Sequence, residues 1–175
     1  AFMSGRIADI AIHPERQSTW YVGVGSGGVW KTENRGTTWT PIFENEDSYS
    51  IGCITIDPNN PNTIWVGTGE NVSGRHVGYG SGVFRSRDGG QNWEAMRNGL
   101  PQEACFFTVL RQAMGGDRRD PAGIYFGTNS GSVFGSMDEG ETWQEIARHM
   151  PTILAVDSLE DHEDDGCGVG PELAI

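Results

Sequence analysis

The stretch Ser86-Arg87-Asp88-Gly89-Gly90-Gln91-Asn92-Trp93 occurs three times in the chain in related form. The other copies are Thr32-Glu33-Asn34-Arg35-Gly36-Thr37-Thr38-Trp39 and Ser136-Met137-Asp138-Glu139-Gly140-Glu141-Thr142-Trp143. The Asp or Asn of each copy can accept hydrogen bonds from nearby backbone N–H groups, and the Gly permits a positive φ. The Trp then brings a large apolar ring back to the core. We call these segments clips 1, 2 and 3 in chain order (residues 32–39, 86–93 and 136–143), and each predicts a tight turn between two strands.

Four short strand patterns accompany each clip. The clip Trp residues stand at positions 39, 93 and 143, which are 54 and then 50 residues apart. A period of about 40–50 residues with four strands in each unit is typical of β-propeller blades. We therefore predict an all-β partial propeller of three four-stranded blades, at about residues 5–45, 49–98 and 104–148. Phe106–Leu110 is the expected first strand of the third blade, and Thr152–Val156 is one extra strand.

The sequence divides into a propeller segment at residues 1–156 and a tail at residues 157–175. The tail is acidic and poor in large apolar residues, so we expect it to be largely disordered. No signal peptide is visible, but a mature secreted chain would look the same, and export stays open.

Composition restricts the class of partner. The formal net charge is −12, which predicts a surface that repels nucleic acid and anionic membranes. No apolar run approaches the roughly 18 residues that span a bilayer. Cys53, Cys105 and Cys167 have no CxxC spacing, so we expect three free thiols, no metal site and no cofactor.

The three clips resemble the Asp-box, also called the BNR repeat, of sialidase-like β-propellers. Residues 22–32, 65–71 and 79–93 also resemble sortilin-like and glycosyl-hydrolase-like bacterial propellers. This resemblance, over about residues 5–156, implies a propeller fold and a secreted or periplasmic location. It implies little about activity, because the repeat occurs in hydrolases, receptors, assembly factors and binding proteins. Such propellers close with about six to eight blades, so three blades indicate a fragment or a join of two related genes.

The resemblance gives the clips a structural role on the outer rim. The clip residues assigned to that role are Thr32, Asn34, Gly36, Trp39, Ser86, Asp88, Gly90, Trp93, Ser136, Asp138, Gly140 and Trp143. We expect Trp39, Trp93 and Trp143 to be mostly buried at equivalent positions.

A glycosidase needs two carboxyl groups about 5–10 Å apart. The candidates on turns and loops are Asp9, Asp57, Glu70, Asp88 and Asp138. Asp57 precedes a proline and is expected to form a turn, like the clip Asp residues, whereas Asp9 can lie near the propeller axis.

Two known kinds of propeller active site do not transfer to this chain. Xyloglucanase-type propellers place a catalytic Asp where this chain has Gly25 and Ser26. Sialidases need an Arg triad, and no spacing supports one from Arg6, Arg75 and Arg85. We assign no catalytic residue.

The candidate binding loop is an insertion at residues 70–80. It carries Glu70, Asn71, Arg75, His76 and Tyr79 among several Gly residues. Loops on rigid scaffolds commonly carry binding residues, and a carbohydrate or a protein would be the ligand. The alternative is a solvated loop whose Gly residues serve only its turns.

Three strand tryptophans also have two interpretations. Trp20, Trp30 and Trp65 can form a sugar-stacking platform, or they can be core residues at period-2 strand positions, which we favour.

Two functions are consistent with the sequence. The first is a non-catalytic propeller module for binding or assembly. The second is a fragment of a secreted glycoside hydrolase with an incomplete active site. Three blades would leave a bare apolar face at each end, and monomers rarely expose such surfaces. We therefore expect a homo-oligomer, a head-to-tail dimer that closes a six-blade ring.

Overall fold

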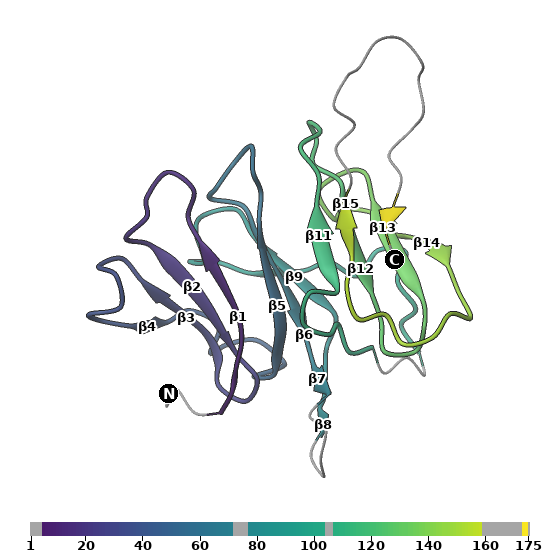
Figure 1. Cartoon of the computed structure of the whole chain (residues 1–175), viewed down its shortest axis with the longest axis horizontal. Helices are drawn as coiled ribbons and strands as arrows, with labels where there is room; N and C mark the ends of the chain where they lie inside the picture. The colour runs from purple at the N-terminus through teal and green to yellow at the C-terminus, as the bar shows by residue number, and fades with distance from the viewer. Residues whose placement is uncertain (1–4, 72–76, 104–106, 159–172, 175) are drawn as a thin grey trace.

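The structure, a computed structural model, describes residues 5–71, 77–103, 107–158 and 173–174. These residues form three four-stranded antiparallel sheets and two short strand pairs, without any helix. Figure 1 shows the three sheets side by side in chain order, from purple through teal to green. The prediction of an all-β chain with three four-stranded sheets is confirmed, and we call the sheets blades 1, 2 and 3.

Blade 1 is a simple antiparallel meander. It contains β1 (Ile7–Ile12), β2 (Trp20–Val24), β3 (Gly28–Thr32) and β4 (Thr40–Pro41), in that order across the sheet. β1 ends before His13 and Pro14, because a proline has no N–H to donate to the ladder. The first clip connects β3 to β4.

Blade 2 repeats this arrangement around the insertion. It contains β5 (Ile51–Ile56), β6 (Ile64–Thr68), β9 (Val83–Ser86) and β10 (Glu94–Ala95). The insertion lies between β6 and β9 and starts and ends with a separate pair, β7 (Glu70–Asn71) and β8 (Val77–Gly78).

Blade 3 contains β11 (Met114–Gly116), β12 (Ile124–Gly127), β13 (Val133–Ser136) and β14 (Gln144–Ala147). The prediction of its first strand at Phe106–Leu110 is wrong for residues 107–110, which form no strand; Phe106 lies outside the described residues. Val109 donates its N–H to the Thr68 carbonyl of blade 2 (3.3 Å), and Leu110 accepts from Ala113 in a turn (3.0 Å). These backbone groups are therefore bonded elsewhere, and the strand begins only at Met114.

The chain after blade 3 runs back along that blade. Residues 152–156 form no strand, contrary to prediction. Two of their N–H groups bond instead to blade 3: Ile153 donates to Thr128 (3.2 Å) and Val156 to Gln112 (2.8 Å). β15 (Asp157–Ser158) then pairs with β16 (Leu173–Ala174). The intervening residues lie outside the described part, so the disordered tail stays a prediction for them.

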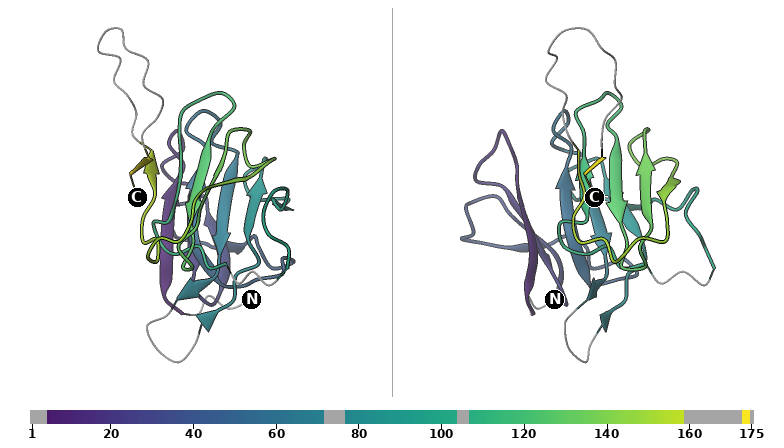
Figure 2. Two further views of the ribbon diagram at one scale, coloured as in Figure 1. Left: turned by 90° about the vertical axis from the view of Figure 1, so that its right-hand side faces the viewer. Right: turned by 45° about the vertical axis from the view of Figure 1, so that its right-hand side comes forward.

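The core lies between the blades. Blades 1 and 2 enclose one cluster, which includes Tyr21, Val29, Phe43, Ile51, Ile54, Ile64, Val66 and Phe84. Blades 2 and 3 enclose another, which includes Cys53, Trp65, Met96, Leu100, Phe126, Phe134 and Trp143. Figure 2 shows blade 2 between the other two in its right-hand view, so only blades 1 and 3 have an outward face.

Two sequence expectations concern cysteine and tryptophan side chains. Cys53 is a buried free thiol, as an apolar packing role requires; the other two cysteines lie outside the described residues. Trp65 and Trp30 are buried, whereas Trp20 is half-buried. The three rings therefore form no exposed platform for a sugar.

Within the described residues the chain has no helix with the length and apolar character needed to cross a membrane.

Candidate functional site

Glu70 is the first residue of the insertion, and its side chain points inward. The side chain is buried and forms an ion pair with Arg6 of the segment before β1. Gly25 leaves the space for it, because a Cβ atom at Gly25 would overlap the Glu70 carboxylate. A buried charge requires a partner of this kind. Glu70 thus fastens the insertion to the segment that leads into blade 1.

Of the other candidates in the insertion, the structure describes only the side chain of Tyr79. The Tyr79 side chain is exposed, while its backbone carbonyl accepts a hydrogen bond from the Ser48 hydroxyl (2.8 Å). Arg75 and His76 lie outside the described residues, and so does the side chain of Asn71. The candidate binding loop therefore stays a prediction, with Glu70 and Tyr79 facing different surroundings.

A cavity of about 520 Å³ lies on the axial side of the blades. It is lined by Ala8, Asp9, Glu70, Leu110, Arg111, Gln112, Thr152 and Leu154. Both oxygens of Asp9 accept backbone N–H groups, from Ile10 (2.8 Å) and from Ile54 of blade 2 (2.8 Å). The two carboxylates of this cavity are thus each engaged by protein groups, and Asp9 serves as a tie between blades 1 and 2.

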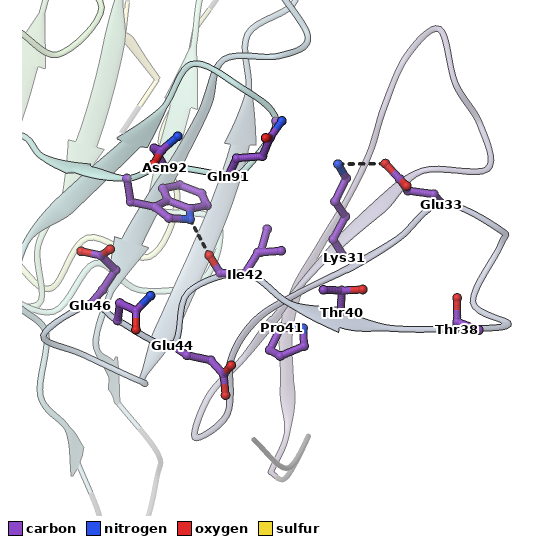
Figure 3. A pocket seen from close by; sticks show the side chains of 14 residues that line it. Lys31, Glu33, Thr38, Thr40, Pro41, Ile42, Glu44, Glu46, Gln91 and Asn92 are labelled. Carbon is purple, nitrogen blue, oxygen red and sulfur yellow. Dashed lines mark hydrogen bonds and ion pairs between the residues drawn. The ribbon is translucent and has the colours of Figure 1, made fainter.

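A second cavity, of about 630 Å³, opens on the rim between β4 and clip 2. In Figure 3, Lys31 and Glu33 form an ion pair (3.0 Å) on one wall, with Gln91 and Asn92 on the other. Ile42 lies between these walls and accepts a hydrogen bond from the indole of Trp93 (2.6 Å). The lining is mostly polar, and the hydrogen bond from Trp93 to Ile42 joins blade 2 to blade 1 across it.

Clip 2 closes its turn through two side chains. Asp88 accepts the N–H groups of Gln91 and Asn92 through one carboxylate oxygen (2.9 Å each). The Ser86 hydroxyl accepts the N–H of Gly90 (2.8 Å) and donates to Asp88 (2.8 Å). Gly90 has φ of 91°, a conformation that favours glycine. The Ser86 hydroxyl and the Asp88 carboxylate therefore hold the turn.

Clips 1 and 3 have the same geometry. Asn34 accepts the N–H of Thr38 (2.9 Å), and Asp138 accepts the N–H of Thr142 (2.8 Å). The matching glycines, Gly36 and Gly140, have φ of 88° and 89°. Asp57 is likewise a turn residue, since its carboxylate accepts the N–H of Asn59 (2.7 Å).

Clip 2 predicts an acid-sensitive stability. Burial alone would raise the pKa of Asp88, but hydrogen bonds from Asn92, Ser86 and Gln91 outweigh burial and lower it from 3.8 to about 2. A lowered folded-state pKa adds stability above the unfolded value, and this stability is lost as the pH falls from about 4 to about 2. We expect Asp88→Asn to lose less stability than the wild type over that window.

Clip 1 supports this test, because Asn34 shows that an amide fits the clip. Chemical denaturation at about pH 5 and about pH 2.5 would measure the difference between wild type and variant. An equal loss in both proteins would show that the Asp88 carboxylate does not contribute.

The clip Trp residues occupy equivalent positions but differ in burial. Trp143 is 3% exposed and packs edge-on against Phe126, with ring centroids 4.9 Å apart. Trp93 is half-buried against Phe43 of blade 1, and Trp39 is half-buried within blade 1. The expectation that all three are mostly buried is confirmed, and Trp143 is the most deeply buried of them. Trp93 and Trp143 both pack across to the preceding blade, and no described blade precedes Trp39.

Where two neighbouring blades meet, an aliphatic side chain packs against a glycine of the preceding blade. We call the aliphatic side chain the plug and the glycine position the socket. Ile51 lies where a Cβ atom of Gly23 would be, and Val109 lies in the same way over Gly67. Gly23 and Gly67 hold the same register position, each opposite a valine of the third strand. This contact was not predicted from the sequence. Its signal there is an apolar residue followed by Gly in the second strand of each blade.

Blade 1 exposes a face whose counterpart in blade 2 is buried. Ile7 and Ile10 hold the register positions of Ile51 and Ile54, as their pairing with β2 and β6 shows. Ile51 and Ile54 are 0% and 6% exposed, whereas Ile7 and Ile10 are 49% and 51% exposed. Ile12 is also exposed. We call Ile7, Ile10 and Ile12 the open face of blade 1.

No protein-family profile matches the sequence. The oligoxyloglucan-reducing end-specific xyloglucanase of Emericella nidulans is 26% identical over 91 residues. A Neosartorya fischeri protein described as a probable enzyme of the same kind is 28% identical over 91 residues. Each alignment covers 50% of this chain and 10% of the relative. The chain thus spans about a tenth of the length of the curated relatives it matches.

Solved β-propeller structures share the fold. A GH74 xyloglucanase of Xanthomonas campestris has a TM-score of 0.63 at 19% identity, over 81% of this chain and 21% of that enzyme. YCF48 of Cyanidioschyzon merolae has a TM-score of 0.53 at 19% identity, over 85% of this chain and 42% of that protein. At this identity the likeness shows the fold alone: a partial β-propeller, with xyloglucanases among its sequence relatives.

Proposed function

We propose that this chain is a non-catalytic segment of an Asp-box propeller that serves in binding or assembly and completes its ring by self-association. The open face of blade 1 carries this proposal. Ile7 and Ile10 are about half exposed, although their counterparts in blade 2 are buried by a neighbouring blade. A contiguous apolar surface of this kind typically marks an interaction site.

The carboxylates support a non-catalytic role. A glycosidase pair needs one group free to donate a proton and another free to act on the sugar or on water. Glu70 is bound by Arg6, Asp9 by two backbone N–H groups, and Asp88 and Asp138 by their clips. Each of these four candidates therefore has a structural partner.

The solution mass tests this function. Two copies, each with three blades, supply the six blades of a small closed propeller. Apolar burial contributes roughly 25 cal/mol per Å², while the repulsion from the net charge of −12 extends only about 8 Å at physiological salt. We expect light scattering over a concentration series to rise from 19.0 kDa toward twice that mass. A constant 19.0 kDa at every concentration, in the wild type and in an Ile153→Ser variant alike, would rule out self-association.

A second candidate function, part of a glycoside hydrolase, is favoured by the xyloglucanase similarity over 91 residues. It predicts turnover of xyloglucan oligosaccharides by this chain, and the proposed function predicts none. Turnover that is lost in Glu70→Gln would establish the hydrolase and make the insertion catalytic.

A further inference from the structure

Blade 3 has an outward face that the chain itself covers. Residues 150–158, which we call the cap, follow β14 and lie against this face. Ile153 and Val156 of the cap pack with Tyr125 and Val133 of blade 3, and all four are buried. The sequence-based expectation of a bare face at each end is therefore wrong for blade 3, because its own chain covers it.

The cap makes the contacts with blade 3 that the start of a following blade would make. Ile153 lies where a Cβ atom of Gly127 would be, as Ile51 does at Gly23 and Val109 at Gly67. Gly127 is opposite Val133, the same register as the other two socket glycines. The backbone contact also repeats: Ile153 donates its N–H to the residue after the socket glycine, Thr128 (3.2 Å), as Val109 does to Thr68 (3.3 Å).

Blade 1 carries a plug without a socket. Ile7 pairs with Val24 in the same register as the plug Ile51 pairs with Thr68. Its side chain is half exposed, since no described blade precedes it. Among the described residues, Ile7 is thus a plug that enters no socket, and the Gly127 socket is filled by Ile153.

A second contact, between an aromatic side chain of one blade and the clip of the next blade, is occupied on the outward face of blade 3. Tyr21 of blade 1 donates to the clip 2 carbonyl of Gly89 (3.4 Å), and Trp65 of blade 2 donates to the clip 3 carbonyl of Glu139 (3.1 Å). Tyr125 holds the same register position in blade 3, but it donates to Asp117 (3.0 Å). The aromatic donor that would receive the next clip is thus occupied within its own blade.

We propose that the cap competes with β1 of a second copy of this chain for the outward face of blade 3. Head-to-tail association then requires release of the cap, so that Ile7 of the second copy enters the Gly127 socket and clip 1 approaches Tyr125. This inference rests on the proposed self-association and adds the surface and the element that controls it.

The competition favours the cap at low protein concentration. A tethered segment acts at an effective concentration in the millimolar range, so the cap holds its socket until the concentration of chain is high. Weakening the plug of the cap should shift the balance toward the second copy. The proposal therefore predicts that a damaging change in the cap strengthens association.

The experiment measures the dimer dissociation constant of the full chain by sedimentation equilibrium. Ile153→Ser removes the buried plug, and we expect its dissociation constant to fall by at least about tenfold relative to wild type. Leu154→Ser is the matched control, because Leu154 is the next residue of the cap and is exposed. Ile7→Ser in the Ile153→Ser background should abolish the gain.

A synthetic peptide of residues 150–158 gives a readout that does not depend on the folding of a variant. Excess peptide should fill the socket and dissociate the wild-type dimer, while the same peptide with Ile153→Ser should not. If wild type dimerises but neither Ile153→Ser nor the peptide changes the equilibrium, the cap inference is wrong and the proposed function stands. If wild type and Ile153→Ser both stay at 19.0 kDa, both proposals are wrong.

Discussion

Replacing Trp143 with alanine is expected to lower the free energy of unfolding by roughly 3–5 kcal/mol, the range for truncating a buried aromatic residue. Trp143 is the most deeply buried of the three clip tryptophans and belongs to the core between blades 2 and 3. Its backbone N–H also donates to Asn98 at the end of blade 2 (2.9 Å). The substitution therefore leaves a cavity where two blades meet.

Two further variants identify the cause of this loss. Trp39→Ala should cost less, since Trp39 is half-buried within blade 1 alone. Trp143→Phe should retain much of the stability, because the Trp143 indole N–H has no hydrogen-bond partner among the described residues. Urea denaturation measures all three, and a loss below about 1 kcal/mol in Trp143→Ala would show that the ring is not a core residue.

Replacing Ile10 with aspartate is expected to raise the dimer dissociation constant by at least about 100-fold. In the proposed ring, Ile10 occupies the environment that Ile54 has in blade 2, where the side chain is buried. An unpaired carboxylate is strongly disfavoured at such a position. The isolated chain tolerates the change, because Ile10 is about half exposed there.

Tyr79→Ser provides the control for this variant. Tyr79 is also an exposed apolar residue, but it belongs to the insertion and not to the open face of blade 1. It should leave the dissociation constant unchanged in sedimentation equilibrium. An Ile10→Asp variant that associates as strongly as wild type would show that the open face is not the interface.

Local patterns were enough to predict the clips and the number of blades. Each clip closes through contacts within eight residues, such as Asp88 with Asn92, so the turn chemistry can be recognised in the sequence. The strands around the clips repeat with period-2 alternation, and three such units gave three sheets. Strand position was less certain wherever backbone groups found partners outside the blade, as Val109 does at Thr68.

The candidate site could not be predicted in the same way. Glu70 was a candidate binding residue, but Arg6, 64 positions away, pairs with it. Asp9 looked like an axial carboxylate, but the N–H of Ile54 in the next blade engages it. Such partners are brought together only by the stacking of blades, so no local pattern reveals whether a carboxylate is free or structural.

By itself the sequence determined the repeating unit, because turn closure and strand alternation depend on neighbours along the chain. Tertiary structure alone decided which copies of that unit are buried. Ile51 and Ile7 have the same place in their blades, yet one is buried and the other exposed. Likewise Ile153, at the end of the third unit, fills the Gly127 socket that a following blade would use. The physical reason is that apolar burial depends on what lies across the face of a sheet, and that neighbour is distant in the sequence.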